Sequence, residues 1–138
     1  MQDFHVEAVG SAADCAVLKV AGEVDVFTAP ALRESILDLA AKGAVHVIAD
    51  LRDVAFLDST GLGVLVGGLK RLRTLDGSLS LVINSDRILR VFKITGLTSV
   101  LPPSSTVPDA ITADPHWLQV AEDQAGSAEE WCRRHELL

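Results

Sequence analysis

The residues best suited to chemistry form the run Asp58-Ser59-Thr60-Gly61, at a point where a strand is expected to lead into a helix. A hydroxyl at a helix start lies near unpaired backbone N–H groups and the positive end of the helix dipole. Phosphorylation of Ser59 would add about −1.5 to −2 charges, which a helix start stabilises and which the Asp58 carboxylate repels. The run therefore predicts a phosphorylation switch. The alternative is that Ser59 only caps the helix.

Four glycines occupy the beginning and middle of the same expected helix: Gly61, Gly63, Gly67 and Gly68. Each costs about 1 kcal/mol relative to alanine inside a helix. Close approach of the helix backbone to a neighbour would offset that cost, and Gly61 would also leave Ser59 uncovered. The alternative is that the glycines only let the helix pack tightly within its own domain.

Two acidic residues, Glu23 and Asp25, lie between an expected strand and the first expected helix. Acidic residues at such a turn are often solvated or serve as capping groups. If this loop lies at the same sheet edge as Ser59, Asp25 would help to form one acidic surface around the hydroxyl.

Known catalytic spacings do not fit the run around Ser59. A phosphate-binding loop would need Lys and then Ser or Thr directly after Gly68, where Leu69 and Lys70 stand. A nucleophile elbow would need glycine two residues before the serine, where Leu57 stands. A hydrolase that uses Ser59 therefore remains only a weak alternative, and we expect no enzyme and no cofactor.

The histidines are scattered along the chain, at His5, His46, His116 and His135. Their spacing shows no metal-ligand pairing, and a catalytic triad with Ser59 would have to assemble in space. We therefore expect these histidines to be structural or exposed and predict no metal site.

Short apolar packets and amphipathic stretches alternate along the chain. Strands are predicted over 4–9, 15–21, 45–51 and 79–83, with a short apolar piece at 99–101, and helices over 28–42, 62–76, 86–96 and from 106. Alternation of strands and helices favours an α/β fold. The opening pair of strands resembles a hairpin, which makes a mixed sheet the expected arrangement.

Composition limits the classes of function. The chain has 138 residues, is 49% hydrophobic and carries a net charge of −7. Such an acidic chain is a poor general binder of nucleic acid, because phosphate contacts need clustered Lys and Arg. The longest run of apolar residues and glycines, 61–69, is too short to cross a membrane. With no secretory signal at its start, the chain is expected to be cytoplasmic, without membrane or direct nucleic-acid partners.

Charge is unevenly distributed along the chain. Residues 1–58 contain ten acidic and four basic residues, whereas residues 70–93 contain six basic and two acidic ones. Two poles of opposite sign suit recognition of a charged protein partner. The alternative is that both are simply solvated faces.

The character of the sequence changes from about Ala113. Residues 113–138 form an acidic segment with six acidic and two basic residues, and Ser127 and Glu130 have the spacing of a capping box. We therefore predict a helix over 127–138. The segment is either a loosely held appendage or a partner-binding element.

Three blocks in this order resemble the STAS-domain anti-sigma factor antagonists, or anti-anti-sigma factors: residues 22–30, 56–65 and 94–97. The block that contains Asp58-Ser59-Thr60-Gly61-Leu62-Gly63 is the most specific. The resemblance covers about residues 4–112. It implies a single STAS domain over 1–112, with a mixed sheet and helices packed mainly on one side, followed by the extension 113–138.

The resemblance also implies a function. Members of this family bind an anti-sigma factor that is also a serine kinase, and so release a sigma factor. The kinase phosphorylates the serine that matches Ser59, which weakens binding, and a PP2C-type phosphatase restores it. The alternative is a STAS scaffold subunit of a stressosome-like or transporter-associated complex. The residues expected to bind the partner are Glu23, Asp25, Asp58, Ser59, Thr60, Gly61 and Leu62.

Overall fold

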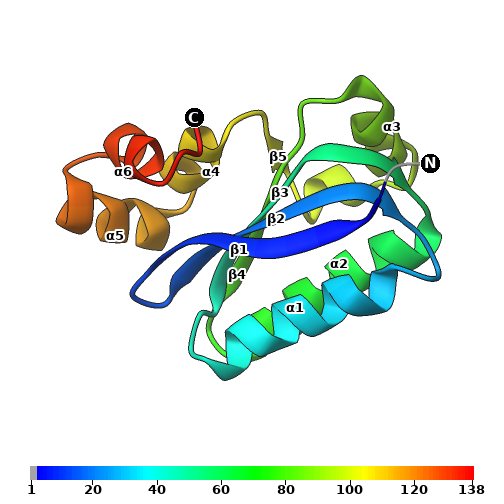
Figure 1. Ribbon diagram of the computed structural model, residues 1–138, viewed down its shortest axis with the longest axis horizontal. Coiled ribbons are helices and arrows are strands. Elements are labelled where there is room, and N and C mark those ends of the chain that lie inside the picture. The colour runs from blue at the N-terminus through cyan, green and yellow to red at the C-terminus, as the bar shows by residue number, and fades with distance from the viewer. Residues whose placement is uncertain (1–2) are drawn as a thin grey trace.

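The computed structural model describes residues 3–138, which are built around one five-stranded sheet (Figure 1). The strands lie in the order β1-β2-β3-β4-β5. Only the pair β1–β2 is antiparallel, and the other neighbouring pairs are parallel. The strands are β1 (His5–Ala12), β2 (Cys15–Val24), β3 (His46–Leu57), β4 (Ser78–Val82) and β5 (Pro103–Ser104). The predicted α/β class and mixed sheet are confirmed.

The central strands are buried on both faces, which explains their nearly continuous apolar sequences. Along β3, Val47, Ala49 and Leu51 belong to one buried cluster, whereas Ile48 belongs to a second one. Successive side chains of a strand point to opposite faces of the sheet. The protein therefore has two cores, one on each side of the sheet.

Helices α1 (Ala29–Ala41) and α2 (Ser59–Thr74) lie side by side over the first core (Figure 1). Helix α3 (Asp86–Ile94) and the 3-10 turn η1 (Leu97–Ser99) close one end of it. The predicted strand at 99–101 is wrong. Leu101 follows the 3-10 turn and is buried in the first core, and β5 begins only at Pro103.

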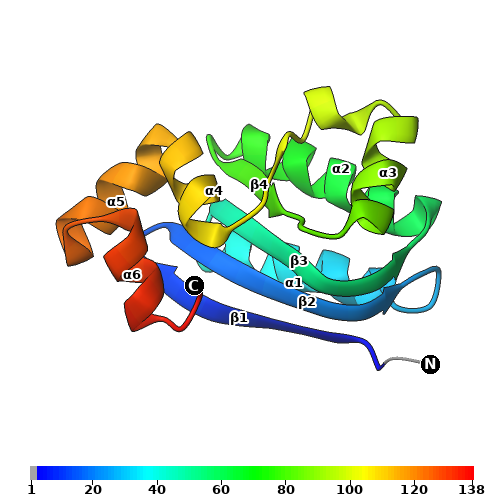
Figure 2. The same cartoon turned by 90° about the horizontal axis from the view of Figure 1, so that it is seen from above.

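The second core is covered by α4 (Val107–Ala113), α5 (Pro115–Ala125) and α6 (Ala128–Arg134), which gather at one end of the sheet (Figure 2). Trp117 and Trp131 lie edge to face, 5.2 Å apart, and both are fully buried. The C-terminal segment is thus packed rather than loosely held, because it buries both tryptophans of the chain in the second core. The boundary predicted between residues 112 and 113 falls near the end of α4.

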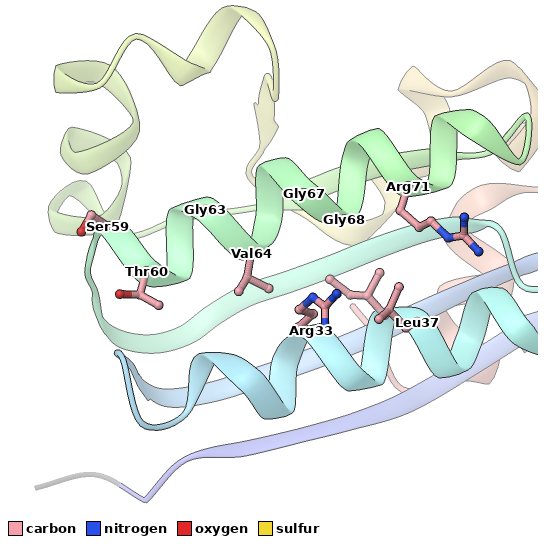
Figure 3. A pocket seen from close by; sticks show the side chains of 10 residues that line it. Arg33, Leu37, Ser59, Thr60, Gly63, Val64, Gly67, Gly68 and Arg71 are labelled. Atoms are coloured by element: carbon pink, nitrogen blue, oxygen red, sulfur yellow. The ribbon is translucent and has the colours of Figure 1, made fainter.

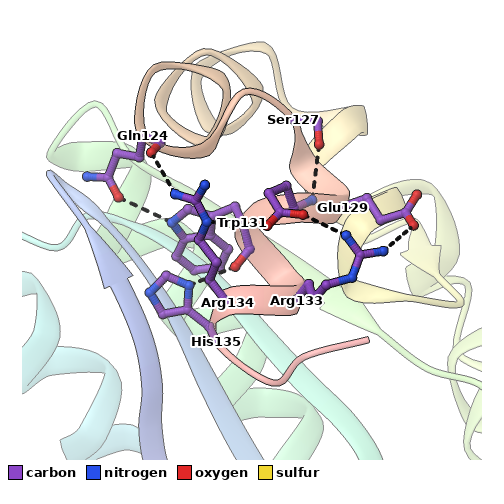
Figure 4. A network of polar contacts seen from close by, with 8 residues as sticks. Gln124, Ser127, Glu129, Trp131, Arg133, Arg134 and His135 are labelled. Atoms are coloured by element: carbon purple, nitrogen blue, oxygen red, sulfur yellow. Dashed lines mark hydrogen bonds and ion pairs between the residues drawn. The ribbon is translucent and has the colours of Figure 1, made fainter.

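Polar contacts fix α6 against the end of α5 (Figure 4). The Ser127 hydroxyl accepts a hydrogen bond from the Glu130 backbone N–H at 3.0 Å, as the capping-box spacing predicts. Trp131 Nε1 donates to the Gln124 side-chain oxygen at 3.3 Å. The helix ends at Arg134 rather than at residue 138, because Glu136 adopts a left-handed conformation and turns Leu137 back into the core.

Candidate functional site at the carboxyl edge of the sheet

The candidate site lies where β2 and β3 end together. These strands are parallel, and Val24 is paired with Leu57. Asp25 directly follows Val24, and Asp58 directly follows Leu57. The Asp58 N–H donates to the Val24 carbonyl at 3.2 Å. Neighbouring strands are about 4.8 Å apart, so the loop that contains Asp25 lies beside the start of α2. From the sequence, the loop with Asp25 was expected beside Ser59 only if both segments lay at the same edge of the sheet.

Asp58, not Ser59, is the N-cap of α2. Asp58 has an extended backbone, and its Oδ1 accepts hydrogen bonds from the N–H groups of Thr60 at 2.9 Å and Gly61 at 3.1 Å. Ser59 is therefore the first helical residue, and the alternative that it merely caps the helix is wrong. Ser59 is exposed, and no hydrogen bond engages its hydroxyl within residues 3–138.

The loop before α1 is held together by its own side chains. Asp25 Oδ1 accepts from the backbone N–H groups of Phe27 at 2.9 Å and Thr28 at 3.1 Å. The Thr28 hydroxyl accepts from the Asp25 N–H at 2.9 Å and donates to the Glu23 carbonyl at 2.8 Å. Asp25 thus shapes the loop with one carboxylate oxygen.

This closed loop carries two apolar side chains out into solvent. Val26 is 58% exposed and Phe27 is 87% exposed. Phe56, next to the end of β3, is 47% exposed. We call these three residues the apolar rim. The sequence pattern did not single out these residues as a surface feature. A Val-Phe pair in a loop, outside any helical or strand pattern, does however indicate exposed apolar side chains.

The four glycines of α2 fall into two classes. A Cβ on Gly61 would lie 2.5 Å from Leu57 Cδ1 and 2.8 Å from Val24 Cγ1, so only glycine fits there without a shift. A Cβ on Gly68 would lie 3.1 Å from Ile36. By contrast, a Cβ on Gly63 or Gly67 would meet nothing within 4 Å. Packing inside the domain therefore explains two of the glycines and leaves Gly63 and Gly67 unexplained.

An open groove of about 780 Å³ runs between α1 and α2 from Ser59 toward a pair of arginines (Figure 3). Ser59 and Thr60 lie at one end, and Arg33 and Arg71 approach from α1 and α2 farther along. We call this the α1–α2 groove. It is lined by Arg33, Ile36, Leu37, Ser59, Thr60, Gly63, Val64, Gly67, Gly68 and Arg71.

The residues predicted to bind a partner lie together but differ in exposure. Ser59 and Thr60 are exposed, whereas Glu23, Asp25 and Asp58 are half-buried. Gly61 and Leu62 are buried. Within residues 3–138, no histidine contacts Ser59, so the geometry offers no triad for the hydrolase alternative.

Comparison with known proteins assigns the fold family. The model of the STAS domain matches residues 6–110. The chain belongs to the STAS domain family. Within residues 3–138, this STAS domain contains no helix that is both long enough and apolar enough to cross a membrane.

Relatives of this STAS domain carry regulatory names. It is 47% identical over 88 residues to the anti-sigma-B factor antagonist of Bacillus subtilis (strain 168), a match that covers 64% of this chain and 80% of the relative. The crystal structure of an anti-sigma factor antagonist from Mycobacterium paratuberculosis superposes with a TM-score of 0.72 at 31% identity, over 80% of this chain and 93% of the other. Both are named for antagonism of an anti-sigma factor and not for a catalytic activity, in agreement with the expectation that the chain is not an enzyme.

A further structural neighbour is the Bacillus cell fate determinant SpoIIAA in its phosphorylated form. It superposes with a TM-score of 0.61 at 25% identity, over 80% of this chain and 98% of the other. A protein of this fold therefore exists in a phosphorylated state.

Proposed function

We propose that this STAS domain is an anti-sigma factor antagonist whose binding is switched by phosphorylation of Ser59. With Ser59 unmodified, it binds an anti-sigma factor that is also a serine kinase, and so releases a sigma factor. The kinase phosphorylates Ser59 and ends the binding, and a PP2C-type phosphatase reverses the modification. The observation that carries the proposal is the exposed Ser59 hydroxyl, which has no hydrogen-bond partner within residues 3–138 and directly follows the Asp58 cap at the sheet edge where the apolar rim also lies.

Two backbone N–H groups at the start of α2 already have a hydrogen-bond acceptor, and this limits what a phosphate on Ser59 could bind there. A helix N-terminus normally offers unpaired N–H groups to an anion. Here the N–H groups of Thr60 and Gly61 are bonded to Asp58. A phosphate on Ser59 would therefore have to displace the Asp58 carboxylate or remain beside it. In both cases the local surface becomes more negative.

The apolar rim supplies a docking surface next to that charge. Phe27 and Val26 are large apolar side chains that the domain itself leaves in solvent, and aromatic residues of this kind often anchor interfaces. A partner that covers the rim also covers the Ser59 hydroxyl at the neighbouring helix start. Burying an unpaired charge in such an interface costs several kcal/mol. A loss of about 3 kcal/mol lowers affinity by more than a hundredfold.

The buried members of the predicted set act as supports. Gly61 lets α2 start directly against Val24 and Leu57, and Leu62 packs in the first core. They fix the position of Ser59 and Thr60 relative to the loop that contains Asp25. Glu23 accepts the Thr28 hydroxyl through its backbone carbonyl, which holds the same loop closed.

The test is a titration of the full chain against the cognate anti-sigma factor kinase. We expect Ser59→Ala to bind and to resist phosphorylation, and Ser59→Asp to bind more than about a hundredfold more weakly. Ser127→Asp is the matched control, because it makes the same change at another helix start, where aspartate caps as well as serine. Mass spectrometry after incubation with kinase and ATP should locate the phosphate on Ser59.

Equal affinities of Ser59→Asp and the unmodified chain would refute the switch. A chain that self-assembles and binds no kinase would instead favour the scaffold alternative, in which Ser59 need not be modified.

A further inference from the structure

A second polar cluster lies at the opposite edge of the sheet from Ser59. There the turn between β1 and β2, the start of β3 and the start of α5 meet. Cys15 is paired with His46 in the parallel register of β2 and β3, and Asp14 precedes Cys15 in the turn. His116 arrives from the second residue of α5. Asp14 and His116 are 102 positions apart, so their sequence spacing indicated nothing.

The side chains of this cluster converge on the Asp14 carboxylate. His116 Nε2 lies 2.7 Å from Asp14 Oδ1, and His46 Nε2 lies 3.8 Å from Asp14 Oδ2. Cys15 Sγ lies 3.7 Å from Asp14 Oδ1. The ligand atoms of Asp14, Cys15 and His116 all lie within 4.8 Å of one another. The rings of His46 and His116 stack, with their centroids 4.0 Å apart.

A chain of hydrogen bonds fixes the proton on His46. The Ser78 hydroxyl is 2.8 Å from Asp114 Oδ2, and because a carboxylate only accepts, the hydroxyl donates to it. Ser78 must then accept from His46 Nδ1 at 3.0 Å. His46 Nε2 is therefore the ring nitrogen that faces the Asp14 carboxylate, 3.8 Å from Oδ2.

The contact to Ser78 holds the His46 ring with Nε2 toward Asp14, the orientation that a shared metal ion would need. A histidine whose second nitrogen donates to a hydrogen-bonded partner is the usual support of a metal ligand. Zinc ligands in a tetrahedral site are about 3.3–3.8 Å apart, given metal–ligand bonds of about 2.0–2.3 Å. The ligand atoms of Asp14, Cys15 and His116 lie within 4.8 Å of one another, so shifts of about 1 Å bring them to these separations.

We propose that Asp14, Cys15 and His116, with His46 as the fourth donor, bind one transition-metal ion of the zinc class. Imidazole and thiolate donors favour zinc over magnesium or calcium, which prefer sites made only of oxygen. The ion enters from solvent, because the Asp14 and His116 side chains are both more than 40% exposed. On binding, the Cys15 thiol and His116 Nε2 each release a proton to solvent, and the neutral His116 ring then carries its proton on Nδ1. The hydrogen bond from His116 to Asp14 is replaced by two metal–ligand bonds.

Such an ion would connect the C-terminal helices to the sheet. His116 belongs to α5, whereas the other donors belong to the β1–β2 hairpin and β3. Metal binding would therefore stabilise the packing of α4, α5 and α6 on the second core, and the energy of binding would become folding energy.

The test uses the full chain, freed of metal with a chelator and titrated with zinc chloride and then with cobalt chloride. We expect one zinc ion per chain and a rise in the thermal midpoint. Cys15 is one of the proposed ligands, and its sulfur binds a metal as the thiolate. Cobalt should therefore give a thiolate-to-metal charge-transfer band together with the visible bands of a tetrahedral site.

Variants separate a metal site from the ion pair that Asp14 and His116 make by themselves. We expect Asp14→Asn and His116→Ala to lose at least about tenfold in zinc affinity, and Cys15→Ser to lose the charge-transfer band. His5→Ala is the matched control, because His5 is an exposed histidine that pairs with Glu7 outside the cluster. Circular dichroism verifies that each variant is folded. Zinc binding that survives His116→Ala, or a cobalt complex without the thiolate band, would overturn the proposal, as would the absence of binding.

Discussion

Replacing Gly61 by alanine tests how tightly the start of α2 is packed against the end of the sheet. The new Cβ would lie 2.5 Å from Leu57 Cδ1 and 2.8 Å from Val24 Cγ1. Both neighbours are buried, so neither can move into solvent. Overpacking of this kind costs about 1–3 kcal/mol, and better helix propensity returns about 1 kcal/mol at most. We expect Gly61→Ala to lower the free energy of unfolding by up to about 2 kcal/mol.

Gly63→Ala is the matched control in the same helix. Because nothing lies within 4 Å of its new Cβ, only the propensity gain of up to about 1 kcal/mol remains. The difference between the two variants isolates the overpacking cost of about 1–3 kcal/mol. Urea unfolding followed by far-UV circular dichroism measures it, and each kcal/mol should also shift the thermal midpoint by roughly 3 °C. Equal stabilities of the two variants would refute the packing argument.

The same pair of variants tests why Gly63 is a glycine. Gly63 lines the α1–α2 groove beside Thr60, and the domain itself does not need it for packing. We expect Gly63→Ala to be more stable than the unmodified chain and yet to bind the anti-sigma factor kinase more weakly, because a methyl group would fill space that the partner approaches. Unchanged affinity would show that the open glycine serves no docking role.

Further outcomes are expected at three side chains, Phe27, Trp131 and Cys132. Phe27→Ser should change the free energy of unfolding by less than about 0.5 kcal/mol, since Phe27 is 87% exposed, but should weaken kinase binding in a titration. Trp131→Ala should cost about 3–5 kcal/mol in urea unfolding, and a smaller loss would contradict its fully buried position. Burial raises the pKa of Cys132 to about 11, so the folded chain should react with iodoacetamide at pH 8 about a hundredfold more slowly at this thiol than the unfolded chain does, as peptide mapping measures. Because the unfolded thiol ionises first, stability should also fall as the pH rises from about 9 toward 11.

The sequence predicted the features that obey local rules. The apolar packets marked β2, β3 and β4, because a strand buried on both faces must be apolar almost throughout. Ser127 marked the start of α6, because its hydroxyl bonds an N–H group only three residues away. The opening hairpin and the mixed character of the sheet were also predicted, because consecutive strands with a short turn pair antiparallel, whereas strands joined through helices favour parallel pairing. Whether Asp25 and Asp58 share one edge of the sheet stayed open in the sequence, and the pairing of Val24 with Leu57 in the structure decided it.

Local rules were insufficient where two neighbouring groups competed for one role. Both Asp58 and Ser59 can cap a helix, and only the backbone conformation at the end of β3 decided that Asp58 accepts from Thr60 and Gly61. Helix propensity also assigns the same unfavourable free energy to Gly61 and to Gly63. Only the position of Val24 and Leu57 revealed that one glycine is required by packing and that the other is open.

By itself, then, the sequence determined the elements, their order and the exposed serine at the start of α2, because capping and periodicity act over a few residues. The tertiary structure alone decided which residues that are distant in the chain meet. Trp117 and Trp131 pack on the second face of the sheet, and His116 contacts Asp14. Such contacts depend on how the three C-terminal helices pack on the sheet, and no spacing within the chain encodes that packing.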